Sequence, residues 1–265
     1  MSLFEYLDRL PVVHLVVRWL RVRQLVGFLL NVFSLNRTLP GSGVQYRCRD
    51  LETLLMAHRV FVGNSYGNVI DSKTTRTFVD LGCNVGLFAA LCAHETGRRD
   101  LHGLMVDANP AMIEETRWLL AANGLDKVVA LHGLVGGAGA GDTAEFYLLP
   151  SHLGSSQFPV YDPSKPPKGA WKKVAVPKID LEAAWKKHFG GARCHLLKVN
   201  IEGSEKELFR TESLFLRRVD KIVVEWHKWL LSRESMEELL RSQGFALVEI
   251  LRETESLGDA VYQRS

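Results

Sequence analysis

The stretch Thr77-Phe-Val-Asp-Leu-Gly-Cys-Asn-Val-Gly-Leu-Phe88 decides the fold of this chain. An apolar run leads into a turn that contains Gly82 and Gly86, and apolar residues with helical spacing follow. This order predicts a strand, a tight turn and a helix, with a turn backbone that a ligand can approach closely. Many βα connections without a ligand also carry two glycines, so the turn needs support from elsewhere in the chain.

The spacing of the glycines separates two classes of ligand. The turn reads Asp80-x-Gly82-x-x-x-Gly86, so Asn84 stands where the dinucleotide fingerprint G-x-G-x-x-G has its middle glycine. Without that glycine, a pyrophosphate cannot press as closely against the turn. S-adenosylmethionine contains no phosphate and does not need the glycine. The turn therefore favours S-adenosylmethionine over NAD.

The next βα unit supplies a carboxylate at the expected place. The short strand from Leu101 to Val106 ends in Asp107, and Asn109-Pro110 starts the following helix. An acidic residue at the carboxyl end of the second strand is suited to accept hydrogen bonds from ribose hydroxyls. A helix-capping acid is the alternative interpretation of Asp107. Together with the glycine turn, ribose binding is the favoured one.

Composition sets broad limits on the protein. A chain of 265 residues that is 46% hydrophobic can bury the core of one α/β domain with an appendage. The four cysteines show no C-x-x-C spacing, which predicts reduced thiols and a cytoplasmic protein, with neither disulfides nor a metal centre.

The basic residues are concentrated in an N-terminal extension, residues 1–45, ahead of the main domain, residues 46–265. Residues 1–47 contain six arginines and two acidic residues, a net charge of +4, whereas the whole chain has +3. The main domain is therefore near neutral, which disfavours nucleic acid as a partner. We expect residues 12–33 to form an amphipathic helix, which packs on the core, self-associates or lies on a membrane surface. Leu39–Gly43 is expected to be a break between the two parts.

The rest of the chain alternates between strand and helix patterns. Residues 144–149 and 173–176 are predicted strands that flank a long loop, and the last two strands are predicted to form an antiparallel hairpin. In an open parallel sheet, ligands lie beyond the carboxyl ends of the strands. The polar residues expected to converge there are Asp80, Asp107, Asn200, Glu202, Glu225 and His227.

The chain resembles the FkbM family of S-adenosylmethionine-dependent methyltransferases, over roughly residues 57–263. The matching segments are Phe78–Phe88, Val106–Pro110, Gly154–Ser156, Val176–Asp180, Leu197–Glu205 and Val223–His227. The segment Lys198-Val-Asn-Ile-Glu-Gly-Ser-Glu205 is the most specific of these. The resemblance implies an α/β class I methyltransferase fold, Rossmann-like, with a seven-stranded, mostly parallel sheet and an antiparallel last strand.

The resemblance also implies a function and a set of site residues. It implies that S-adenosylmethionine methylates a hydroxyl of a small molecule, a sugar or another natural product. The residues that it places around the methionine part of the cofactor are Asp80, Gly82, Asn84 and Gly86. It places Asp107 at the ribose, beside Asn109, and His132 and Gly133 near the adenine. One departure from the family pattern is Asn200, which stands where relatives usually have aspartate.

Methyl transfer to a hydroxyl needs alignment and a base that removes the proton. An unperturbed histidine titrates in the right range, so His227 is the predicted base. Glu202 is predicted to orient the acceptor, and Asn200 completes the predicted catalytic set. The alternatives are a non-catalytic protein that binds S-adenosylmethionine and, less favoured, a nicotinamide-dependent oxidoreductase.

Overall fold

The computed structural model describes residues 22–66, 68–136, 141–149 and 172–265. The strands in these ranges are β1 (Leu35–Thr38), β2 (Gln45–Cys48), β3 (Thr77–Leu81), β4 (His102–Asp107), β5 (Val128–His132), β6 (Thr143–Leu148), β7 (Lys172–Pro177), β8 (Cys194–Val199), β9 (Val219–His227), β10 (Phe245–Glu253) and β11 (Leu257–Arg264). The helices are α3 (Val22–Phe33), α4 (Leu51–Phe61), α5 (Leu87–Thr96), α6 (Pro110–Ala122), α7 (Leu181–Phe189), α8 (Glu205–Thr211), α9 (Ser213–Leu216) and α10 (Arg233–Ser242).

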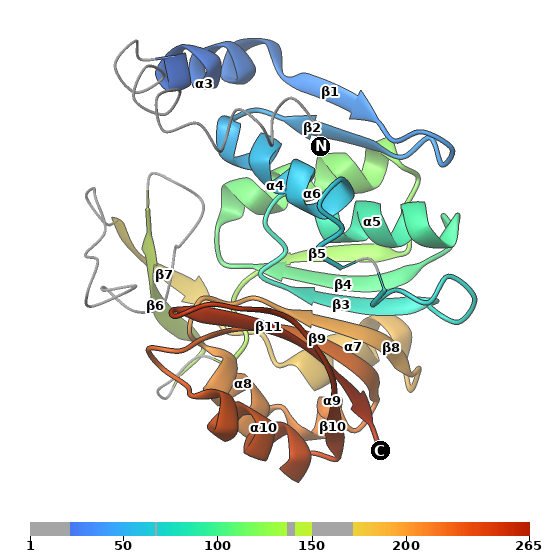
Figure 1. Ribbon diagram of the computed structural model, residues 1–265, viewed down its shortest axis with the longest axis vertical. Coiled ribbons are helices and arrows are strands. Elements are labelled where there is room, and N and C mark those ends of the chain that lie inside the picture. The colour runs from blue at the N-terminus through green and yellow to red at the C-terminus, as the bar shows by residue number, and fades with distance from the viewer. Residues whose placement is uncertain (1–21, 67, 137–140, 150–171) are drawn as a thin grey trace.

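Seven strands form the central sheet, in the order β10-β11-β9-β8-β3-β4-β5 (Figure 1). Strand β3, from the glycine-turn stretch, lies in the interior of the sheet and pairs in parallel with both β4 and β8. Strand β11 pairs antiparallel with β9 and with β10, so it alone runs against the others. The expected seven-stranded, mostly parallel sheet with an antiparallel last strand is confirmed.

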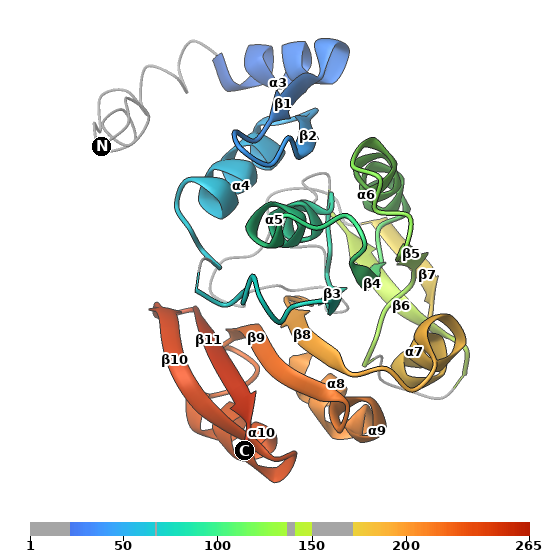
Figure 2. The same ribbon diagram turned by 90° about the vertical axis from the view of Figure 1, so that its right-hand side faces the viewer.

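Helices cover both faces of this sheet (Figures 1 and 2). Helices α4, α5 and α6 lie on one side, and α7, α8, α9 and α10 lie on the other. Each face of the sheet has its own hydrophobic core, and successive residues of a strand point into opposite cores. Phe78 packs with the first group of helices and Val79 packs with the second. Because both faces are buried, the strands are almost continuously apolar in sequence. A polar residue such as Asp80 within them therefore requires a specific partner.

A β-hairpin occupies the place of the break predicted at Leu39–Gly43. Strands β1 and β2 pair antiparallel, and the segment between them is the hairpin turn. The Arg47 guanidinium donates from Nε to Glu115 Oε2 of α6 at 2.7 Å and lies 4.1 Å from the centre of the Trp118 ring. These contacts dock the hairpin on α6. The helix of the N-terminal extension ends at Phe33, which is the predicted end of the amphipathic helix.

Helix α3 is the described part of the segment predicted to form an amphipathic helix, and residues 12–21 lie outside the described ranges. The predicted apolar stripe is divided, because Val26 and Leu30 are partly buried whereas Leu29 and Phe33 are exposed. The exposed large apolar side chains of α3 are Leu25, Phe28, Leu29, Val32 and Phe33. Within the described ranges, no helix is long and apolar enough to cross a membrane. Association of this face with protein or lipid stays a prediction.

The predicted strands around the long loop are confirmed as β6 and β7, which pair antiparallel. Phe146 and Val176 of this pair form a small apolar cluster with Ala108 and Leu134 next to the main sheet. The predicted loop between the two strands lies outside the described residues from 150 to 171. The hairpin predicted at the end of the chain is confirmed as β10 and β11.

Candidate active site

A cavity of about 1060 Å³ opens at the carboxyl ends of β3, β4, β8 and β9. Eight of the eleven residues predicted for the site line it: Asp80, Gly82, Asn84, Asp107, Asn109, Gly133, Asn200 and Glu202. The other three, Gly86, His132 and His227, lie outside its wall. Most of the residues that were expected at the carboxyl ends of the parallel strands therefore lie around one cavity.

Asp107 organises the glycine turn. Its Oδ2 accepts a hydrogen bond from the backbone N–H of Asn84 at 2.8 Å, and its Oδ1 accepts one from the N–H of Asn109 at 2.8 Å. Asn84 adopts a left-handed backbone conformation, with φ of 50°. Burial raises the pKa of the Asp107 carboxyl, and the two N–H groups act against this rise. Each carboxylate oxygen keeps a further lone pair that can accept from a ligand hydroxyl.

A buried ion pair supports the other side of the turn. Asp80 is fully buried, and its Oδ1 lies 2.9 Å from Lys198 Nζ on the adjacent strand β8. The same ammonium group donates to the carbonyl oxygen of Gly82 at 2.8 Å. Burial lowers the pKa of Lys198, but the negative charge of Asp80 outweighs this and raises it. We assign both groups as charged, since this form also satisfies the Gly82 carbonyl.

Replacing Lys198 with methionine is expected to lower the free energy of unfolding by about 3 kcal/mol, because it leaves the Asp80 carboxylate buried without its cation. Urea denaturation followed by circular dichroism measures the change. Lys186→Met is the matched control, since the Lys186 side chain is exposed and its partner Glu182 keeps a second cation, Arg218. Equal stability of the two variants would contradict the assignment of a charged pair.

The backbones of β3 and β8 approach each other closely beyond their ends. A Cβ atom on Gly82, which has φ of 74°, would lie 1.8 Å from the carbonyl oxygen of Asn200. Asn200 in turn donates its N–H to the Leu81 carbonyl at 3.0 Å. The side-chain Oδ1 of Asn200 is buried and has no hydrogen-bond partner among the described residues. A donor group of a bound ligand would satisfy this acceptor, which suits a nucleoside or amino-acid ligand in the cavity.

The remaining predicted cofactor residues have structural contacts. Asn109 caps α6, because its Oδ1 accepts from the N–H of Ala111 at 3.1 Å. Gly86 caps α5 with φ of 86°, and a Cβ there would contact Thr116 of α6. His132 lies outside the cavity wall, with Nε2 at 3.0 Å from the Ala108 carbonyl oxygen.

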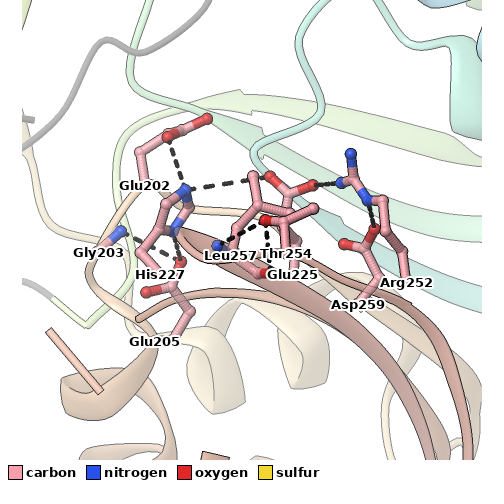
Figure 3. A network of polar contacts seen from close by, with 9 residues as sticks. All are labelled: Glu202, Gly203, Glu205, Glu225, His227, Arg252, Thr254, Leu257 and Asp259. Atoms are coloured by element: carbon pink, nitrogen blue, oxygen red, sulfur yellow. Dashed lines mark hydrogen bonds and ion pairs between the residues drawn. The ribbon is translucent and has the colours of Figure 1, made fainter. Parts of the chain in front are cut away.

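A network of charged side chains lies at the ends of β8, β9 and β11 (Figure 3). His227, at the end of β9, is 2% exposed and lies between two carboxylates. Its Nε2 is 3.2 Å from Glu202 Oε2, and its Nδ1 is 3.3 Å from Glu205 Oε1. On the other side of the network, Arg252 contacts Glu225 Oε2 at 2.6 Å and Asp259 Oδ2 at 2.6 Å.

The burial of His227 outside the cavity wall argues against its predicted role as the general base. Burial lowers the pKa of His227, but hydrogen bonds and charge interactions with Glu202 and Glu205 outweigh this effect and raise the pKa to about 10. At neutral pH the ring therefore holds both protons and has no lone pair to accept another. Glu202 lines the cavity and is the group of this pair that a ligand can reach.

Three of these residues offer atoms that suit a metal ion. One ligand atom each from Glu202, Glu225 and His227 lies within 4.8 Å of the others. Carboxylate oxygens and an imidazole nitrogen form a donor set that divalent metals accept. The proton of His227 already balances the charge of Glu202 at 3.2 Å, so the geometry does not require a metal.

The sequence model of the methyltransferase FkbM domain matches residues 80–247, more than half of the chain. The chain belongs to the FkbM methyltransferase family. The match contains the carboxyl ends of β3, β4, β8 and β9, where the cavity opens. No curated protein sequence matches the chain significantly.

Several solved structures have a chain trace similar to that of this protein. The alignment with the METTL16 methyltransferase domain has a TM-score of 0.46 and 15% sequence identity. It covers 92% of this chain and 79% of that domain. The alignment with TrmK of M. capricolum, solved with S-adenosyl-homocysteine, has a TM-score of 0.46 and 8% sequence identity. It covers 77% of this chain and 68% of TrmK. The alignment with an S-adenosylmethionine-dependent methyltransferase from Aquifex aeolicus has a TM-score of 0.46 and 10% sequence identity. It covers 81% of this chain and 96% of that protein. These distant likenesses carry no conclusion about the substrate of this FkbM protein.

Two groups of cavity residues in this FkbM protein were not predicted from the sequence. One group precedes β3 and includes Asn64, Tyr66 and Asn68, and the other lies on β10 and β11 and includes Arg252 and Asp259. Tyr66 packs edge-on against Phe88 of α5, and burial raises its pKa to about 12. No local motif marks either group, because each reaches the cavity through packing between elements that are distant in sequence.

Proposed function

We propose that the protein is an S-adenosylmethionine-dependent O-methyltransferase that acts on a hydroxyl of a small molecule, a sugar or another natural product. The observation that carries the proposal is one cavity that joins Asp107 and the glycine turn to the carboxylate of Glu202. Membership of the FkbM methyltransferase family supports the same reaction class.

The cofactor would lie along the turn. When bound, S-adenosylmethionine supplies a methyl group already activated by its sulfonium charge. Asp107 would accept hydrogen bonds from the ribose hydroxyls, and Gly82 lines the cavity beside it. The partnerless Oδ1 of Asn200 would accept from the amino end of the cofactor. The protein's main contribution is then alignment of the two reactants.

Glu202 would act as the base for the acceptor hydroxyl. Its side chain is 22% exposed, lines the cavity and is held at Oε2 by the charged ring of His227. A carboxylate in this position can take the hydroxyl proton as the new oxygen–carbon bond forms. This assignment gives Glu202 the role of base that was predicted for His227, and His227 instead holds the carboxylate of Glu202.

The charge of the cavity wall favours a small neutral or cationic acceptor. The acidic residues at the acceptor end are Glu202, Glu225, Glu249 and Asp259, and Arg252 is the cation paired with two of them. A polyphosphate chain would be repelled there, whereas a sugar offers hydroxyl donors to these carboxylates. Nucleic acid is therefore not part of the proposal.

We also propose a cytoplasmic location, with membrane association or self-association through residues 12–33. The four cysteines are free and buried, which fits a reducing compartment. The exposed apolar side chains of α3 supply a surface for such an association.

Calorimetric titration with S-adenosylhomocysteine and, in parallel, with NADH tests the function. Micromolar binding of S-adenosylhomocysteine without binding of NADH is the expected result, and the reverse would assign a nicotinamide enzyme. Methyl transfer from labelled S-adenosylmethionine to a panel of sugars and polyols then separates an enzyme from a non-catalytic binding protein. Absence of S-adenosylhomocysteine binding by folded protein would overturn the proposal.

Replacing Glu202 with glutamine is expected to lower the turnover number about 100-fold, because the amide cannot accept the hydroxyl proton. The affinity for S-adenosylhomocysteine should stay within a factor of about two. Steady-state kinetics and calorimetry measure the two quantities. Glu238→Gln, on the exposed face of α10, is the control. Unchanged turnover in Glu202→Gln would remove Glu202 as the base.

A further inference from the structure

The loop between β8 and α8 holds Glu202 in an unusual backbone conformation. Glu202 has φ of 51° and Gly203 has φ of 102°, so two consecutive residues are left-handed. For a non-glycine residue this conformation costs on the order of 1 kcal/mol and persists only where surrounding contacts enforce it. Such strained residues are concentrated at functional sites.

Glu205, the first residue of α8, supplies one of these contacts to the loop. It is 1% exposed, and its Oε1 accepts a hydrogen bond from the backbone N–H of Gly203 at 3.1 Å. The same oxygen lies 3.3 Å from Nδ1 of His227. The carboxylate therefore joins the loop backbone to the histidine ring (Figure 3).

His227 connects this buried carboxylate to the one on the cavity wall. Its two ring nitrogens face different carboxylates, Glu205 at 3.3 Å and Glu202 at 3.2 Å. A neutral imidazole has one N–H, so its other nitrogen would turn a lone pair toward a carboxylate oxygen at 3.2 or 3.3 Å, where the two repel each other. The doubly protonated ring donates toward both carboxylates and avoids this repulsion.

The other charged groups nearby do not compete for this proton. Glu225 Oε1 is 4.0 Å from His227 Nε2, but its Oε2 has Arg252 at 2.6 Å as its own cation. Asp259 is paired with the same guanidinium. The positively charged ring of His227 therefore interacts mainly with the carboxylates of Glu202 and Glu205.

We propose that Glu205 and His227 form a positioning relay for Glu202. Glu205 holds the ring of His227 in its doubly protonated form, and His227 fixes the carboxylate of Glu202 on the cavity wall. Both are positioning residues, since neither lines the cavity. The relay deepens the proposed function, because its value for catalysis rests on Glu202 acting on the acceptor.

The protonation of His227 is measured directly by ¹⁵N nuclear magnetic resonance of the histidine rings. The chain has nine histidines, and the signal of His227 is assigned in the wild-type protein by through-bond correlation of the ring with its own backbone. At pH 8 both ring nitrogens of His227 are expected to carry protons in the wild-type protein. A neutral ring at pH 8 would overturn the proposal, and this result needs no variant to fold.

Glu205→Gln tests the link between the two residues, with Glu207→Gln on the same helix as the control. The titration midpoint of His227 is expected to fall by at least one pH unit in Glu205→Gln and to stay unchanged in Glu207→Gln. With an acceptor found by the methyl-transfer screen, kcat of Glu205→Gln should fall about tenfold at constant KM, and Glu205→Asp should recover part of it. An unchanged midpoint would overturn the relay.

Failure of the relay is distinguishable from failure of the proposed function. Loss of the relay changes the histidine titration and leaves binding of S-adenosylhomocysteine intact. If the wild-type protein does not bind S-adenosylhomocysteine, the methyltransferase proposal fails, whatever the histidine titration shows.

Discussion

Replacing Gly82 with alanine is expected to destabilise the protein by more than about 4 kcal/mol, enough to prevent folding of a marginally stable domain. The added Cβ would lie 1.8 Å from the carbonyl oxygen and 2.9 Å from the carbonyl carbon of Asn200. Neither backbone can move aside freely, because Gly82 donates to the Val106 carbonyl at 2.9 Å and Asn200 to the Leu81 carbonyl at 3.0 Å. Overlap with fixed backbone costs far more than overlap with a side chain that can rotate.

Gly97→Ala is the matched control for this variant. Gly97 also has a left-handed backbone, with φ of 64°, but a Cβ there would meet nothing within 4 Å. Gly97→Ala should lower the free energy of unfolding by about 1 kcal/mol, because alanine tolerates the left-handed backbone less well than glycine and meets no steric overlap there. Soluble yield and chemical denaturation compare the two proteins. If both lose the same stability, close approach of β3 and β8 is not what excludes a side chain at Gly82.

Replacing Asp107 with alanine is expected to weaken binding of S-adenosylhomocysteine by at least about 1000-fold, or roughly 4 kcal/mol. A hydrogen bond to a charged group contributes about 1.5 to 3 kcal/mol, and two ribose hydroxyls would donate to this carboxylate. The substitution also removes the acceptor of the Asn84 and Asn109 N–H groups, which hold the turn in place. Calorimetry of the folded variant measures the loss.

Two further variants isolate the role of the carboxylate. Asp107→Asn should bind with intermediate affinity, because the amide oxygen still accepts while the NH₂ group faces a backbone donor. Asp100→Ala, whose side chain is 65% exposed, should bind like the wild type. Wild-type affinity in Asp107→Ala would show that Asp107 only caps the turn and that the ligand lies elsewhere.

Local patterns were sufficient for the central elements of the fold. The strand, turn and helix at 77–88 and the capped start of α6 depend on residues that are neighbours in sequence. The sequence therefore predicted them correctly. The hairpin of β1 and β2 was missed, since it is held by contacts such as Arg47 with Glu115, 68 residues away. Its turn residues alone look like a linker.

By itself, the sequence indicated the family and its sheet through the resemblance of its motifs. It also indicated most of the polar residues at the carboxyl edge, because strand ends and glycine spacing are local properties. Only the tertiary structure decided which member of the pair Glu202 and His227 faces the cavity. That choice depends on the left-handed backbone of Glu202 and on the burial of His227 against Glu205. Both arise from packing between β8, α8 and β9, which no pattern within a single segment specifies.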